Sequence, residues 1–141
     1  MPRFTRASDL RKHLEEAANS LQQQVVMTTQ DQLGSEEVSP VDTGRFRSSW
    51  FAAEGSPSRA VAPEGANSPN DDAKSLRIRG DKTYFLSNSL PYAQAIAIEG
   101  RTNPEKNQKS KPANWFASFR NSNIPKIQRN AARQVKQEFD L

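Results

Sequence analysis

The sequence predicts an α+β fold in which N- and C-terminal helices pack on a small antiparallel β-sheet, with long polar loops. Two observations support this prediction. Apolar residues recur every three or four positions near both ends of the 141-residue chain, which is typical of amphipathic helices. Between these regions, short stretches alternate apolar and polar residues, which is typical of strands. The length suits one domain covering residues 1–141, since domains commonly contain about 100–150 residues.

The composition limits the possible classes of function. Only 34% of the residues are hydrophobic, the net charge is +4, and there are no cysteines. Disulfides and thiolate metal sites are therefore excluded. The single histidine, His13, is interpreted as a solvated residue and not as a ligand. No stretch approaches the ~20 apolar residues of a membrane span, and the N-terminus lacks the apolar run of a signal peptide. We expect a non-secreted protein without a metal, a cofactor or a membrane partner.

The first helix is expected at about residues 8–33. Ser8 is a plausible N-cap, and Asp9 suits the positive end of the helix dipole. Gly34 follows the last periodic residue, where a helix stop is expected. The predicted apolar stripe consists of Leu10, Leu14, Ala17, Leu21, Val25 and Thr28.

A backbone corner is expected next, around Gly44. Glycine permits a conformation that a Cβ would oppose, and Asp42 or Thr43 can accept hydrogen bonds from nearby backbone amides. Phe46 and Trp50 are four residues apart, which indicates one helical turn leading into a strand at about 50–53.

The middle of the chain alternates between loop and strand signals. Residues 55–73 contain three prolines and no periodicity, so a long loop or arm is expected there, with Asp71 and Asp72 solvated. Residues 75–79 and 83–87 alternate apolar and polar side chains around a turn at Gly80 and Asp81. They are predicted to form a β-hairpin.

The C-terminal part should contain two helices. Pro91 opens a short one that Gly100 ends, with Ala93, Ile96 and Ala97 packed inward. A second polar loop is expected at about 101–113. The last helix is predicted to begin near Pro125, with Ser122 or Asn123 as its cap. Its apolar stripe would consist of Ile127, Ala131, Val135 and Phe139.

Residues 101–141 carry nine basic and three acidic side chains, which favours an anionic partner or else a solvated helix face. Near them lie Trp115, Phe116 and Phe119, which are candidate interface residues. Aromatic and basic residues together suit single-stranded nucleic acid. The alternative, which we favour, is that these aromatic residues anchor the core or a subunit interface.

No motif for catalysis is present. The chain has no Gly-rich phosphate loop, no nucleophile elbow and no cluster of metal ligands. We therefore expect a protein that is not an enzyme.

Two segments resemble a phage tail-completion family, typified by the gene-ten-like tail component of lambdoid siphophages. That family has a long N-terminal helix before a Pro-Val-Asp-Thr-Gly-Arg-hydrophobic-Arg-Ser motif, and later an Asn-x-x-Pro-Tyr-Ala segment followed by a hydrophobic-Glu-x-Gly ending. In this chain glycine directly follows the glutamate, so the ending fits imperfectly. The matching residues include Pro40, Asp42, Thr43, Gly44, Arg45 and nearby Trp50, and then Asn88, Pro91, Tyr92, Ala93, Glu99 and Gly100.

The resemblance implies a structural virion protein, assembled in the host cytoplasm, that forms a ring at the head–tail junction. It implies a cyclic homo-oligomer, for which six-fold symmetry is the first choice and twelve-fold the second. Its partners would be neighbouring neck, portal-side and tail-tube proteins, with transient, non-specific contact to double-stranded DNA. The alternative function is a basic single-stranded nucleic-acid-binding module.

Overall fold

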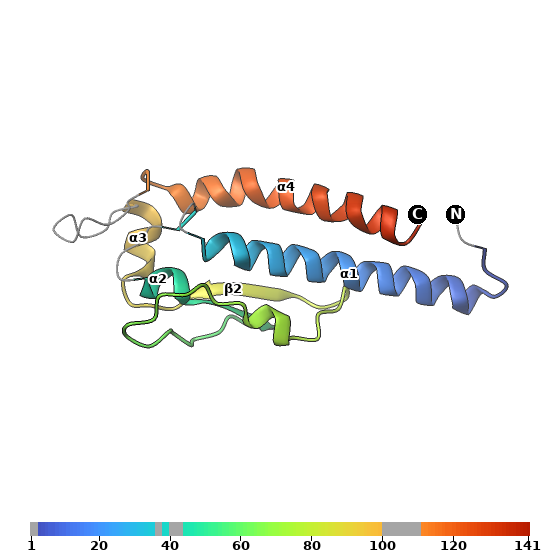
Figure 1. Ribbon diagram of the computed structural model, residues 1–141, viewed down its shortest axis with the longest axis horizontal. Coiled ribbons are helices and arrows are strands. Elements are labelled where there is room, and N and C mark those ends of the chain that lie inside the picture. The colour runs from blue at the N-terminus through green and yellow to red at the C-terminus, as the bar shows by residue number, and fades with distance from the viewer. Residues whose placement is uncertain (1–2, 36–37, 40–43, 100–110) are drawn as a thin grey trace.

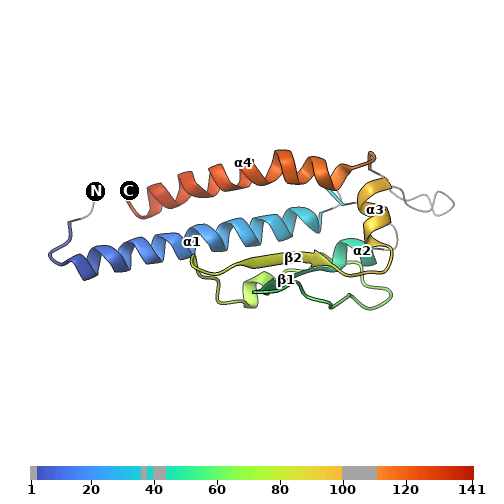
Figure 2. The ribbon, with the colours of Figure 1, turned by 180° about the vertical axis from the view of Figure 1, so that it is seen from behind.

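Two long helices and a two-stranded sheet form three layers in the computed structural model, with the C-terminal helix outermost and the N-terminal helix in the middle (Figures 1 and 2). The structure describes residues 3–35, 38–39, 44–99 and 111–141. The predicted α+β class is confirmed. The helices are α1 (Ala7–Leu33), α2 (Arg45–Ser48), α3 (Ala93–Glu99) and α4 (Trp115–Glu138). The strands are β1 (Trp50–Glu54) and β2 (Tyr84–Asn88), and a 3-10 turn, η1 (Asp72–Ser75), lies between them in the sequence.

Helix α1 has the predicted extent, but its start and its buried face differ from the prediction. The N-cap is Arg6, whose carbonyl accepts the amides of Asp9 and Leu10 at 3.1 and 3.3 Å, so Ser8 lies inside the first turn. Leu10 and Leu14 are 36% and 46% exposed, because the sheet covers only the C-terminal half of α1 (Figure 1). The buried residues of α1 are Ala17, Val26, Thr29, Gln30 and Leu33.

His13 is not the solvated residue that we expected. Its Nε2 lies 2.7 Å from the carbonyl oxygen of Phe139, and its ring packs between Phe4 and Phe139 at centroid distances of 5.1 and 5.4 Å. This contact joins the N-terminal half of α1 to the C-terminal end of α4.

The sheet pairs different segments from those predicted. β1 runs antiparallel to β2, with Trp50 opposite Asn88 and Glu54 opposite Tyr84. Residues 75–79, predicted to be half of a hairpin, form no strand, and Ser75 is the last residue of η1. The expected turn at Gly80 and Asp81 is present.

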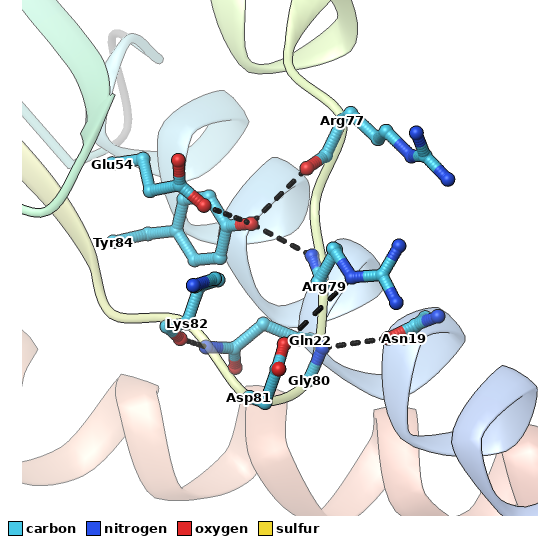
Figure 3. Close-up of polar contacts among 9 residues, drawn as sticks. All are labelled: Asn19, Gln22, Glu54, Arg77, Arg79, Gly80, Asp81, Lys82 and Tyr84. Carbon is cyan, nitrogen blue, oxygen red and sulfur yellow. Dashed lines mark hydrogen bonds and ion pairs between the residues drawn. The ribbon is translucent and has the colours of Figure 1, made fainter.

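The side chain of Tyr84 explains why the hairpin is absent (Figure 3). Its hydroxyl accepts the amide of Arg79 at 2.7 Å and donates to the carbonyl of Arg77 at 3.2 Å. Helix α1 holds the following turn, since Asn19 Oδ1 accepts the amide of Gly80 at 2.8 Å. The backbone groups that a second strand would have used are therefore bonded to side chains, while Ile78 is buried.

Helix α4 begins ten residues before the predicted start, and Pro125 lies inside it. A proline inside a helix removes one backbone hydrogen bond and costs about 3 kcal/mol. Burial of Trp115 and Phe119 in the first two turns offsets this cost, at about 1.5–3 kcal/mol for each large apolar side chain. Ile127, Ala131 and Val135 of the predicted stripe are buried as expected. Phe139, its fourth member, is the C-cap just after the helix and is only partly buried.

The core has two parts. The larger part joins the C-terminal end of α1 to α2, α3 and the start of α4. A smaller part lies between α1 and the sheet and consists of Val26, Ala52, Ala73 and Ile78. The larger part consists of Leu33, Phe46, Trp50, Leu90, Ala93, Ile96, Trp115, Phe119 and Ile127.

Candidate functional site: the corner where the two motifs meet

The two motifs, 44 residues apart in the sequence at Gly44 and Asn88, meet at one corner of the molecule. Asn88 Nδ2 donates a 2.8 Å hydrogen bond to the carbonyl oxygen of Phe46, and Asn88 is also the cross-strand partner of Trp50. Its Oδ1 accepts the amide of Leu90 at 3.3 Å, so the same side chain shapes the turn towards α3. The described parts of both motifs therefore lie where a helix joins the sheet, as predicted.

Gly44 has the backbone conformation that the sequence predicted. Its φ is +94°, in the left-handed region, and its carbonyl accepts the amide of Ser48 at 3.1 Å to close α2. The space is also tight, since a Cβ at this position would lie 2.9 Å from the Cα of Asn67. The proposed cap residues Asp42 and Thr43, with Pro40, lie outside the described residues.

The motif arginines bind backbone carbonyls of the long loop. Arg45 Nε donates to the carbonyl of Ala62 at 2.8 Å, and Arg47 Nη2 donates to the carbonyl of Asn67 at 2.6 Å. Ser49 Oγ accepts the amide of Ala62 at 3.0 Å. The expected loop is present at residues 55–71, but these contacts hold it against α2 instead of leaving it as an extended arm.

Trp50 connects the corner to the end of α1. Its Nε1 donates to Ser39 Oγ at 3.1 Å, and Ser39 Oγ in turn donates to the carbonyl of Leu33. Trp50, Ser39 and Leu33 are all buried. Because a buried polar group without a partner is costly, this relay fixes how the chain leaves α1 and enters the sheet.

A buried glutamine links α1 to the sheet and to η1. Gln30 Nε2 donates to the carbonyl of Trp50 at 3.0 Å and to Asp72 Oδ1 at 2.5 Å, while its Oε1 accepts the amide of Ala73 at 3.0 Å. Asp72 Oδ1 also accepts the amide of Ala52 at 3.1 Å.

The sequence analysis missed this network. We expected Asp71 and Asp72 to be solvated, which is correct only for Asp71, whose carboxylate pairs with Lys74 at 3.3 Å on the surface. The sequence did contain a signal that Gln30 is buried. Gln30 lies four residues after Val26 and three before Leu33, so it shares their face of α1.

Two of the three candidate interface residues, Trp115 and Phe119, lie in the core of the molecule. Trp115 is 6% exposed and Phe119 4% exposed, and Trp115 Nε1 donates to the carbonyl of Ile96 at 2.9 Å. Of the two expected roles, anchoring the core or anchoring a subunit interface, Trp115 and Phe119 have the first. Buried rings are not accessible for stacking on single-stranded bases. Phe116 is partly buried and stacks on Trp50, with ring centroids 5.6 Å apart and planes 15° apart.

Phe116 also borders an apolar groove of about 390 Å³ at this corner. Ile98 lines the groove and is 50% exposed. On the same helix, Ala93 and Ile96 are buried as predicted, while Ala97 is partly buried. Tyr92, in the second motif, is 38% exposed. Glu99 is the last residue of α3, and Gly100 lies outside the described residues.

Within the described ranges there is no group of three metal-ligating His, Asp or Glu side chains. No helix in those ranges is long and apolar enough to cross a membrane. The polar side chains of the corner mostly contact backbone groups of their own chain. The arrangement therefore fixes the backbone geometry of the corner.

Comparisons with known proteins give no match: no family model, curated protein or solved structure matches the chain.

Proposed function

We propose that this chain is a structural virion protein of a tailed phage and forms a ring at the head–tail junction. The observation that carries the proposal is the hydrogen bond from Asn88 to Phe46 beside the Trp50–Asn88 pair. It joins the two segments on which the resemblance to the tail-completion family rests. A shared role in one corner gives a physical reason for both motifs to occur in one chain.

The contacts of the motif residues support a structural role without catalysis. Gly44 forms a left-handed turn, Arg45 binds a loop carbonyl, and Asn88 binds a carbonyl and an amide. Catalytic side chains need polar atoms directed at a substrate, whereas these are directed at the backbone. We propose no cofactor and no catalytic residue.

In the proposed assembly, copies of the chain form a closed ring, six-fold as the first choice and twelve-fold as the second. Interfaces in such rings are heterologous, so two different faces of the subunit contact each other. The ring would contact neck, portal-side and tail-tube proteins and act as a tail-completion protein, a terminator or a connector. Double-stranded DNA would pass through it with only transient contact.

The decisive experiment is cryo-electron microscopy of particles purified from the organism that encodes the chain, with symmetry left free. We expect density for this fold at the junction of head and tail. Mass spectrometry of the same particles provides an independent check. If this chain is missing from purified particles that contain the other tail proteins, the proposal is wrong.

A single-stranded nucleic-acid-binding function was the alternative. Its sequence basis was the aromatic group near basic residues, and burial of Trp115 and Phe119 weakens that basis.

A further inference from the structure

The outer face of α4 carries a row of four basic side chains, Lys126, Arg129, Arg133 and Lys136. Their spacing of three, four and three residues places them within about 80° of arc on the helix, at 3.6 residues per turn. The buried residues Ile127, Ala131 and Val135 lie on the opposite side, towards α1. Since α4 is the outermost layer, the row faces away from the rest of the subunit (Figure 1).

All four cations are exposed, and none has a hydrogen bond or ion pair in the described parts of the chain. The acidic residue of α4, Glu138, projects to the other side of the helix. Helix α1 is different, because Arg11 and Lys12 lie among Asp9, Glu15 and Glu16. The row on α4 is therefore a surface of one sign on a rigid element, and its positive charge is not neutralised locally.

Most of the side chains that border the row are polar. Ser122, Asn130 and Gln137 lie beside the four cations and are exposed, and the apolar residues beside the row, Pro125 and Ala132, are small. Protein interfaces usually have an apolar centre in which lysine is depleted, and this face has no apolar centre. Arginine, lysine, serine, asparagine and glutamine are the side chains that commonly contact phosphate oxygens of DNA.

The length of the basic row and the lack of aromatic residues on this face of α4 indicate which kind of nucleic acid the face can bind. Lys126 and Lys136 are separated by about 15 Å along the helix axis, and double-stranded DNA carries one charge per ~1.7 Å of its own axis. Several phosphates can therefore lie along the row. Single-strand binding relies on aromatic residues that stack on bases, and this face has none.

We propose that the outer face of α4 is a sequence-independent contact for the phosphate backbone of double-stranded DNA. The inference rests on the proposed function only for the expectation that duplex DNA passes this surface. The contact should be weak and rapidly reversible, because four surface cations neutralise few phosphates and read no bases.

The test measures binding of a fluorescent duplex of about 30 base pairs by anisotropy at about 50 and about 200 mM salt. The variant K126Q/R129Q/R133Q/K136Q removes the row. The matched control R6Q/R11Q/K12Q/K74Q removes the same charge from exposed residues elsewhere. Circular dichroism verifies that all three proteins are folded.

We expect the native chain to bind with a dissociation constant of about 1–100 μM at the higher salt and with a clear salt dependence. The α4 variant should bind at least about tenfold more weakly at low salt, with its log–log salt slope reduced by about 2 or more, since each phosphate contact contributes about 0.9. The control should stay within about threefold of the native chain.

Three results would overturn the inference. One is an equal loss in both variants, which would mean that only net charge matters. Another is tighter binding of single-stranded oligothymidine that survives in the α4 variant. The third is no duplex binding by the native chain while polyglutamate binds through the row, which would indicate an acidic protein partner. None of these results affects whether the chain is present in virions, and absence from virions would not alter an α4-dependent contact with DNA.

Discussion

The side-chain amide of Asn88 donates to the backbone carbonyl of Phe46 across 42 residues of sequence, and this contact joins the two motifs beside the Trp50–Asn88 pair. Asn88 lies at the end of β2, and Phe46 lies in the turn of α2 that precedes β1. The bond therefore lies at one end of the sheet and helps to fix its register, since the described part of the chain gives this sheet two strands and no third neighbour.

Replacing Asn88 by alanine should lower the free energy of unfolding by about 1–2 kcal/mol. The change removes one of the two donors to the Phe46 carbonyl, which keeps the amide of Ser49 at 3.1 Å, and leaves the Leu90 amide without its side-chain acceptor in a partly buried place. Urea denaturation followed by circular dichroism measures the loss. Gln94→Ala, at an exposed position of the neighbouring helix, is the control and should stay within about 0.5 kcal/mol. Equal stability of the two variants would contradict the role given to Asn88.

Gly44→Ala should destabilise the protein more than Gly65→Ala. Both glycines have positive φ, at +94° and +86°, so alanine introduces backbone strain of about 1–2 kcal/mol at each. Only at Gly44 does the new Cβ also approach Asn67, whereas nothing lies within 4 Å at Gly65. Thermal melting of both variants checks the order. If the melting temperature fell equally in both variants, the corner around Gly44 would accommodate the new Cβ without an added loss of stability.

Asp71 and Asp72 form a matched pair for testing the buried network. Asp72→Ala removes the acceptor used by Gln30 and by the amide of Ala52, and should cost about 1–3 kcal/mol. Asp71→Ala removes a surface ion pair with Lys74 and should cost less than about 1 kcal/mol. The comparison is made by urea denaturation in the same buffer. If Asp71→Ala were the more damaging change, the network would not stabilise the fold as described.

Tyr84→Phe should loosen the segment at residues 77–80 with a smaller effect on the rest of the fold. The hydroxyl bonds the backbone of Arg77 and Arg79, so its removal should speed amide hydrogen exchange at Arg79 by about tenfold, which corresponds to about 1.4 kcal/mol. The exposed residue Tyr92 provides the control, since Tyr92→Phe should leave that exchange unchanged. An unchanged exchange rate in Tyr84→Phe would show that other contacts hold the segment.

Periodicity was sufficient to predict the extent of α1, the presence of α3 and the burial of Ile127, Ala131 and Val135 in α4, because these depend on local patterns of apolar residues. It was not sufficient for the strand partner of β2. Residues 75–79 have the alternation of a strand, but the position of the Tyr84 hydroxyl depends on tertiary structure. The early start of α4 was missed for a related reason, since burial of Trp115 outweighs the local effect of Pro125.

At the candidate site, the sequence predicted the conformation of Gly44 and the corner positions of both motifs. It did not predict that Arg45 and Arg47 would bind the long loop, because long-range partners leave no periodic signal. Burial of the aromatic group was an open alternative in the sequence, and the structure decides it for Trp115 and Phe119.

The packing of His13 between Phe4 and Phe139 makes one end of the molecule different from the other. These residues lie at the end of the α1–α4 pair that extends past the sheet, and the motif corner lies at the other end (Figures 1 and 2). Tags or fluorophores joined before Phe4 and after Phe139 would therefore sit side by side and far from Asn88. A donor and acceptor placed there would report separation of the two long helices while leaving the corner unmodified.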